Sequence, residues 1–372
     1  MTKLFGNSAR QSTLTQFHID GPLVLGLLAL VSFGLVILYS ASGQNIAMMQ
    51  GQIIRLGIAM AVMIALAQIK PQTLKRWSLP LFLAGLALLV AVLMVGHIGK
   101  GAQRWLDLGF MKFQPSEIMK LAVPMAVAWF IATHSLPPKI WHLLVGVIMC
   151  AAPTLLIAVQ PDLGTSILIA TAGVFVLFMS GMSWRIIIFV AGIISAFLPV
   201  LWIFLMHDYQ RQRVLTFINP ESDPLGSGYH IIQSKIAIGS GGLEGKGYLQ
   251  GTQSQLEFLP ERHTDFIFAV ISEELGLLGV LVLLALYLFI IYRCMVISSQ
   301  AQDNYGKLVA GSFTLTFFVY VFVNIGMVSG LLPVVGVPLP LVSYGGTSMV
   351  TLMAAFGIIM SLGTHKRILA AP

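Results

Sequence analysis

The sequence reads Leu259-Pro260-Glu261-Arg262-His263-Thr264-Asp265-Phe266-Ile267-Phe268 where a charged loop passes directly into an apolar helix. Residues 207–264 form the one long polar excursion of the chain, and together with Asp265 they hold seven of its 14 carboxylates. A carboxylate at the edge of a membrane costs desolvation energy and is rarely without a role. We therefore expect any chemistry of this protein at this junction.

The rest of the chain is too apolar for a water-soluble protein. It is 57% hydrophobic and only 9% charged, whereas soluble domains carry about 25% charged residues. A membrane-crossing helix needs about 20 apolar residues, and we count ten such spans. They cover residues 22–42, 52–69, 77–97, 116–134, 140–159, 163–181, 185–206, 265–292, 307–330 and 342–363.

The spacing of these spans predicts the architecture. Several spans are separated by only a few residues, so neighbouring helices must be antiparallel within one bundle. The predicted fold class is an all-α, polytopic integral membrane protein with ten transmembrane helices. Residues 1–372 form a single membrane domain, and residues 207–264 form one large extracytoplasmic loop between spans seven and eight.

The distribution of charge predicts the orientation. With a cytoplasmic N-terminus, basic residues are concentrated in short inner loops, where Asp20 and Asp303 are the only carboxylates. On the outer side, basic residues are diluted over longer loops. Both termini are therefore predicted to be cytoplasmic in an inner-membrane, multi-pass protein, with span one as an uncleaved anchor. The net charge of +7 then reflects topology, and no nucleic-acid partner is expected.

Two polar sites lie at the starts of predicted spans. Glu117 and Lys120 are three residues apart and share one helical face. They can form a buried ion pair that neutralises both charges, and they can also form the polar wall of a cavity in which Lys120 meets a phosphate. Asp162 precedes span six, where a carboxylate can cap the helix or bind a ligand.

The loop and span eight contain further candidates. Arg211 and Arg213 form a basic patch, and residues 229–238 have the spacing of an amphipathic helix on the outer leaflet. The glycines that follow do not match a P-loop, and no spacing resembles a zinc site. We expect Glu273 and Glu274 to lie about 12 Å below Asp265, hydrogen-bonded by neighbours such as Asn324, on a helix that bends near Gly276 or Gly279.

Several motifs together carry a resemblance to a known family. Between spans nine and ten the chain reads NIGMVSGLLPVVGVPLPLVSYGGTS over residues 324–348. This stretch resembles the signature of the SEDS family, whose members serve bacterial shape, elongation, division and sporulation. Other stretches that resemble the family, in the same order, are residues 113–117, 160–164, 229–247 and 261–268. Residues 100–107 and 206–214 resemble the elongation branch more than the division branch.

The resemblance implies a function and a set of site residues. It implies a peptidoglycan glycosyltransferase that polymerises lipid II at the outer face of the inner membrane. The implied partners are a class B penicillin-binding protein, which crosslinks the strands, and other elongation-complex membrane proteins. Asp265 matches the essential carboxylate of the family. Glu117, Lys120, Asp162 and Arg213 match polar positions that line the same cavity.

Chemical reasoning from the residues agrees with this function. Nucleotide sugars are not present outside the membrane. The donor of a glycosyl transfer there must therefore already carry its leaving group, as a polyprenyl-diphosphate sugar does. Lys120, Arg213 and Arg262 can bind the diphosphate, and Asp265 can act as the general base. A divalent cation, Mg or Mn, on the diphosphate is chemically reasonable, although no protein metal site is predicted.

Two other classes of function are open at this point. A lipid II flippase or other transporter also needs many spans and a polar cavity, but it needs polar groups near the midplane and on both sides. Here the carboxylates are concentrated on the predicted outer side, which favours surface chemistry. In a non-catalytic scaffold that recruits the crosslinking partner, Asp265 would be dispensable.

The predicted orientation can be tested with cysteines in a variant that lacks Cys150 and Cys294. An impermeant maleimide added to intact spheroplasts should label Ser222→Cys, in the predicted outer loop, and should not label Ser299→Cys, on the predicted inner side. Labelling at position 299 but not at 222 would overturn the topology.

Overall fold

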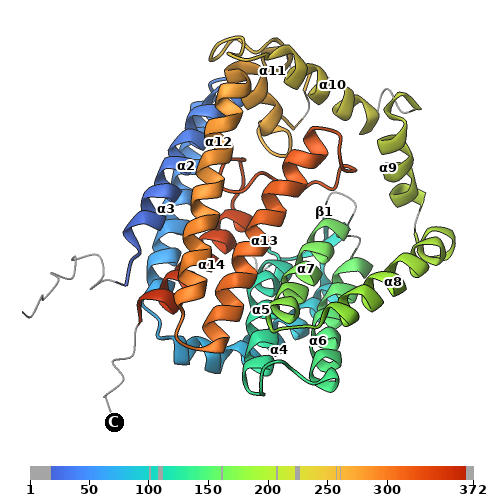
Figure 1. Ribbon diagram of the computed structural model, residues 1–372. Helices are drawn as coiled ribbons and strands as arrows, with labels where there is room; N and C mark the ends of the chain where they lie inside the picture. The colour runs from blue at the N-terminus through green and yellow to red at the C-terminus, as the bar shows by residue number, and fades with distance from the viewer. Residues whose placement is uncertain are drawn as a thin grey trace, which may run out of the picture.

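A helix corresponds to each of the ten predicted apolar spans in the computed structural model (Figure 1). The structure describes residues 18–99, 102–107, 112–160, 162–206, 208–222, 227–256, 258–259 and 261–365. In chain order the ten helices are α2 (Gly21–Ala41), α3 (Ile46–Ala67), α4 (Pro71–Val95), α5 (Pro115–Ala132), α6 (Ile140–Val159), α7 (Leu163–Met179), α8 (Trp184–Val200), α12 (Ile267–Gln300), α13 (Asn304–Val328) and α14 (Thr347–Thr364).

Eight of these helices are long and apolar enough to cross a membrane. The two others are α7, which is apolar but has 17 residues, and α8, which has 17 residues and continues into the π-helical turn η1 (Leu201–Leu205). The chain is therefore a nearly all-helical, multi-pass membrane protein, and the count of ten spans stays a prediction. Figure 1 shows α8 at the periphery of the bundle, whereas α13 and α14 lie near its centre.

Local chemistry moves several helix ends away from the predicted positions. The second span begins at Ile46 rather than at 52, because the Asn45 side chain accepts a hydrogen bond from the Met48 N–H at 3.0 Å and caps the helix. The third begins at Pro71 rather than at 77, because a proline at the first helical position has no N–H to satisfy. The last begins at Thr347 rather than at 342.

The purely helical prediction is wrong between α4 and α5. The strands β1 (His97–Gly99), β2 (Ala102–Asp107) and β3 (Lys112–Phe113) pair there as a small antiparallel sheet in the order β1-β2-β3. The apolar spans on either side hid these short strands, which are amphipathic and have no span-like signal of their own. The sheet places Arg104 beside the start of α7, as described below.

The segment between α8 and α12 is mostly helical and lies at one end of the bundle, here called the loop end. It contains α9 (Asp208–Ile218), the 3₁₀ turn η2 (Pro220–Ser222), α10 (Ser227–Ser240) and α11 (Thr252–Gln255). The predicted amphipathic helix is confirmed as α10. Its buried face packs on protein, since Ser234 Oγ donates to the Val328 carbonyl at 2.8 Å. The opposite end of the bundle, where Arg293 pairs with Asp20 at 2.6 Å, is here called the terminal end.

The helix α12 is broken at Gly276, which confirms the predicted bend. Gly276 has φ 62° and ψ −159°, a backbone conformation that essentially only glycine adopts. The freed backbone groups pair with the loop: Lys246 N–H donates to the Glu273 carbonyl at 2.9 Å, and Leu277 N–H donates to the Gly242 carbonyl at 3.0 Å. The first nine residues of α12 therefore form a separate segment.

This break reverses the predicted depth of the carboxylates. Glu274 lies at the loop end of α2, where Ser40 Oγ donates to it at 2.5 Å. Thr264, next to Asp265, accepts from Ser343 Oγ at 2.5 Å, and the adjacent Val342 packs against Gly34, six residues before Ser40. Six helical residues correspond to about 9 Å. Asp265 therefore lies deeper in the bundle than Glu274, and the expectation that the glutamates lie below it is wrong.

The break predicts a strong effect of Gly276→Ala. A Cβ at this position would lie 2.3 Å from the Gly245 nitrogen and 2.6 Å from the Leu243 oxygen, and the backbone conformation alone costs about 1–3 kcal/mol for other residues. We expect a large loss of monodisperse protein after detergent extraction, measured by size-exclusion chromatography.

Gly57→Ala is the matched control, because nothing lies within 4 Å of a Cβ there and alanine favours a helix. Equal yields of the two variants would show that the break at Gly276 does not require glycine.

Candidate functional site

Glu117 and Lys120 form a buried ion pair at the start of α5. Lys120 Nζ lies 2.7 Å from Glu117 Oε1, and the two side chains are only 11% and 9% exposed. Pro115 starts the helix, which places both residues on one face in its first turns. The predicted pairing is confirmed, and at this burial the pair is screened little by solvent.

Two neighbouring helices complete the surroundings of this pair. Glu117 also accepts hydrogen bonds from Thr351 Oγ1 at 2.9 Å and from Ser348 Oγ at 3.3 Å, both on α14. Lys120 Nζ lies 5.6 Å from the ring centroid of Tyr320 on α13, within cation–π range. The pair therefore joins α5, α13 and α14. In each of these helices, more than half of the most apolar 18-residue stretch is buried. Tyr320 and Thr351 were missed in the sequence, since single hydroxyls in apolar spans give no periodic signal.

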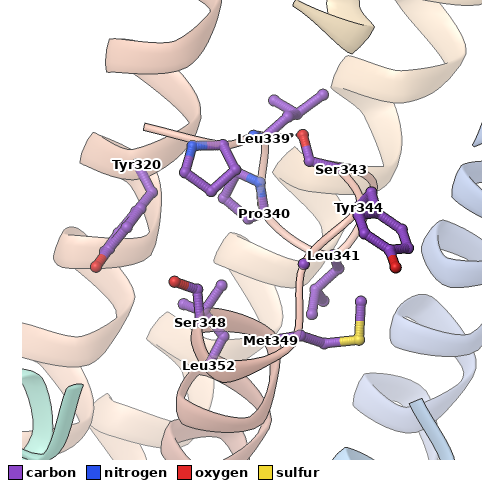
Figure 2. Close-up of a pocket in the computed structure, with 11 residues that line it drawn as sticks. Tyr320, Leu339, Pro340, Leu341, Ser343, Tyr344, Ser348, Met349 and Leu352 are labelled. Atoms are coloured by element: carbon purple, nitrogen blue, oxygen red, sulfur yellow. Dashed lines mark hydrogen bonds between the residues drawn. The ribbon is translucent and has the colours of Figure 1, made fainter. Parts of the chain in front are cut away.

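A small cavity of about 20 Å³ lies beside this pair. Figure 2 shows Tyr320 on one side of it and Tyr344 on the other, with Pro340 and Leu341 between them and Ser348 below. A volume of this size holds water but not a sugar. The cavity is therefore a small, mostly apolar gap between helices rather than a complete substrate pocket.

Asp162 has the capping role that the sequence left open, and a ligand-binding role stays a prediction. Its side chain caps α7 by accepting from the Thr165 N–H at 3.3 Å, and it also accepts from Gln114 Nε2 at 3.3 Å. Arg104 on β2 lies 3.9 Å from the same carboxylate. Arg104 was not predicted as a site residue, although a basic residue in a family-like stretch was a usable signal.

Asp265 lies two residues before α12, whereas the predicted span began at residue 265, because the helix begins at Ile267. Its backbone carbonyl accepts from Asn324 Nδ2 at 2.9 Å, and the same amide group donates to the Val337 carbonyl at 2.7 Å. Its Oδ2 would lie 3.5 Å from a Cβ placed on Gly336. Asn324 thus supports Asp265, and the expectation that it braces the glutamates of α12 is wrong.

The start of α7, which Asp162 caps, and Asp265 both lie against the same short segment. A Cβ on Gly164, which follows Asp162, would lie 3.1 Å from the Val335 carbonyl oxygen. Asp265 faces the next residue, Gly336. The segment between α13 and α14 therefore contacts both Asp265 and the start of α7. A shared cavity of Asp162 and Asp265 stays a prediction.

Of the two arginines predicted to bind the diphosphate from the loop, the structure describes the side chain of Arg262 but not that of Arg213. Arg262 Nη1 donates to the Ser254 carbonyl, and its Nη2 would lie 3.4 Å from a Cβ on Gly43. These contacts direct it toward α11 and the loop end of α2. Arg213 belongs to α9, but its side chain lies outside the described residues. Diphosphate binding by either residue stays a prediction.

Glu273 and Glu274 are fully buried structural residues. Glu273 accepts from Lys246 Nζ and from the Gln253 N–H, both at 2.8 Å. Burial and the nearby Glu274 raise the pKa of Tyr248, whose hydroxyl donates to the Val36 carbonyl at 2.9 Å. The expected role of the glutamates as internal polar bracing is confirmed, with the loop as the partner.

The side chains that could ligate a metal ion can be compared with the predicted divalent cation. Within the described part of the chain, no three His, Cys, Asp or Glu side chains are grouped so that they could hold a metal ion. Mg²⁺ is often bound by one or two carboxylates together with substrate phosphates and water. A cation held here would therefore need the diphosphate of a substrate as a ligand, beside a carboxylate such as that of Asp265, which faces Gly336.

The fold and the site define a polytopic membrane protein with a buried ion pair at the α5–α13–α14 junction. The family model of FtsW, RodA and SpoVE cell cycle proteins matches residues 16–368. The chain belongs to this family, the SEDS family. It is 57% identical over 364 residues to peptidoglycan glycosyltransferase MrdB of Escherichia coli K12, covering 98% of each protein. It is 36% identical over 358 residues to the probable peptidoglycan glycosyltransferase FtsW of Idiomarina loihiensis, covering 92% of this chain and 86% of that protein.

Solved structures agree with this assignment. A chain from a study of the structural coordination of polymerization and crosslinking by a peptidoglycan synthase complex superposes with a TM-score of 0.81 at 32% identity. That match covers 94% of this chain and 99% of the other. The rod shape determining protein RodA of Thermus thermophilus superposes with a TM-score of 0.70 at 28% identity, covering 92% and 96%. The predicted resemblance to the elongation branch is confirmed.

The buried pair predicts a non-additive mutant series. Glu117→Ala and Lys120→Ala should each impair function and folded yield, because removing one partner leaves an uncompensated buried charge that costs about 3–5 kcal/mol. The double variant Glu117→Gln/Lys120→Met should give more folded protein than either single variant, measured by size-exclusion chromatography.

Lys139→Ala, which removes an exposed lysine, is the control and should behave as the wild type. If both single variants were fully active and expressed normally, the pair would be neither structural nor catalytic.

Proposed function

We propose that this protein is a peptidoglycan glycosyltransferase that polymerises lipid II into glycan strands during cell elongation. The observation that carries this proposal is the position of Asp265. It lies on a segment that enters the bundle from the loop end, faces Gly336, and is held through its own backbone carbonyl by Asn324. The name of the Escherichia coli relative supports the same activity.

Asp265 acts as the general base in this proposal. An acceptor hydroxyl is a poor nucleophile until a positioned base takes its proton as the new bond forms. The hydroxyl oxygen attacks the anomeric carbon of the donor, its proton passes to Asp265, and the bond to the polyprenyl diphosphate breaks. A single displacement of an α-linked diphosphate inverts the linkage to β. The polyprenyl tail of the donor stays in the membrane beside the helices.

The diphosphate needs positive charge as it leaves. Lys120, Arg213 and Arg262 are the proposed contacts, with Mg or Mn as an additional neutralising cation. Lys120 and Arg104 already face Glu117 and Asp162, respectively. These two pairs are close to neutral, so they offer hydrogen bonds more than net charge.

We also propose the cellular setting of this reaction. Both termini face the cytoplasm, residues 207–264 face outward, and the ten helices cross the bacterial inner membrane as a single domain over residues 1–372. A class B penicillin-binding protein is the crosslinking partner, together with other elongation-complex membrane proteins. The likeness to a chain of a peptidoglycan synthase complex supports such a partner.

The decisive test is Asp265→Asn in full-length protein, purified with its class B partner and supplied with labelled lipid II. The change keeps shape and hydrogen bonding but removes basicity, so glycan polymer should fall by about 10²–10⁴-fold. Folding and association with the partner should be unchanged.

The control Glu244→Gln neutralises an exposed carboxylate of the same loop and should keep wild-type polymer synthesis. Polymer at the wild-type rate from Asp265→Asn would exclude Asp265 as the base. If the wild type makes no polymer, the proposed activity itself fails, and a flippase or a scaffold becomes the better reading.

A further inference from the structure

Arg55 is a cation in the interior part of a spanning helix. It lies nine residues after Ile46, the first residue of α3, which places it about 13.5 Å along the helix axis. A charge at such a depth is costly, and in membrane proteins it usually faces a cavity or pairs with another group. Arg55 therefore needs a partner.

The described residues do not supply a carboxylate for it. None of the ion pairs formed by described residues includes Arg55, and its Nη1 is buried without a hydrogen-bond partner among them. By contrast, Lys120 and Arg293, which also lie in spanning helices, pair with Glu117 and Asp20. Among the described residues, no carboxylate therefore compensates the positive charge of Arg55.

An aromatic ring orients this guanidinium. Its central carbon lies 4.8 Å from the ring centroid of Tyr344, and its Cδ would lie 3.2 Å from a Cβ on Gly346. Stacking on the ring leaves the N–H edge of an arginine available, and that edge matches a phosphate in a bidentate geometry. The neighbouring α14 starts at Thr347 without a capping side chain, so the positive end of its dipole lies nearby.

The same aromatic residue links Arg55 to the proposed base. The Tyr344 N–H donates to the His263 carbonyl at 2.8 Å, and the two rings are 6.0 Å apart. His263 precedes Asp265 by two residues. One turn before Arg55, Gln52 donates to the Ser343 carbonyl at 3.4 Å and accepts from the Gly345 N–H at 3.4 Å. The face of α3 that carries Arg55 therefore adjoins the segment that carries Asp265.

We propose that Arg55 binds a phosphate of the polyprenyl-diphosphate group of the substrate. The proposal rests on the function proposed above and adds a binding residue to it. It pairs the charge of Arg55 with the anionic diphosphate that the donor and the leaving group share. Because the cation lies within the membrane, it selects a phosphate that is attached to a lipid tail over a phosphate in water.

The test measures binding of farnesyl diphosphate and of farnesol to full-length protein in phosphate-free detergent, by native mass spectrometry. The wild type should bind the diphosphate more tightly than the alcohol. Arg55→Gln should weaken diphosphate binding by about tenfold or more, because hydrogen bonds to charged groups are the strong ones, and it should leave farnesol binding unchanged. Arg55→Lys keeps the charge and should retain intermediate affinity.

The control Arg76→Gln removes an exposed arginine at the start of α4 and should bind both probes as the wild type does. If Arg55 were only structural, Arg55→Gln would weaken both probes equally, and that result would overturn the inference. So would equal displacement of farnesyl diphosphate by short-chain phosphatidylglycerol, which would mark an ordinary phospholipid site. These binding results do not depend on polymer synthesis, so the inference and the proposed activity can fail separately.

Discussion

A backbone that turns within a membrane protein must satisfy its own N–H and C=O groups, since lipid offers no hydrogen bonds. At Gly276 the loop between Gly242 and Gly247 meets this requirement. Gly247 N–H donates to the Glu274 carbonyl at 3.0 Å, and Leu278 N–H donates to the Leu243 carbonyl at 3.2 Å. Because these bonds hold the break, the segment before it can descend into the bundle and bring Asp265 to Gly336.

The second organising constraint is charge compensation at low dielectric. The pair Glu117–Lys120 is stabilised by hydroxyls of α14, and Glu273 is surrounded by the N–H groups of residues 253 and 254. A buried charge that has its partners adds little net electrostatic field, so such residues shape the site more than they attract an anion. Against this background, a guanidinium with an aromatic neighbour and no carboxylate among the described residues is chemically distinct. The division between structural and substrate-binding charges follows from this difference.

The helices and the shared face of Glu117 and Lys120 were predictable from residue order, because both depend on local periodicity. Continuous apolar runs require helices in lipid, and a spacing of three residues aligns two side chains on any helix. The motif order also identified Asp265 and Asp162, since it reflects a family-wide pattern. Arg55, by contrast, is the one charged residue of α3, and no local pattern marks a single cation as part of a site.

Local residue order could predict neither the depth of Asp265 in the bundle nor the residues that contact it. A run of apolar residues from 265 to 292 looks like one straight span, and whether Gly276 breaks it depends on a loop some 30 residues earlier that supplies the hydrogen bonds. The same holds for Asn324, which contacts Asp265 across 59 positions of the chain. Local residue order therefore accounts for the helices of this protein. The position of its central carboxylate follows from long-range backbone pairing, because only a distant segment can satisfy the groups that a broken helix exposes.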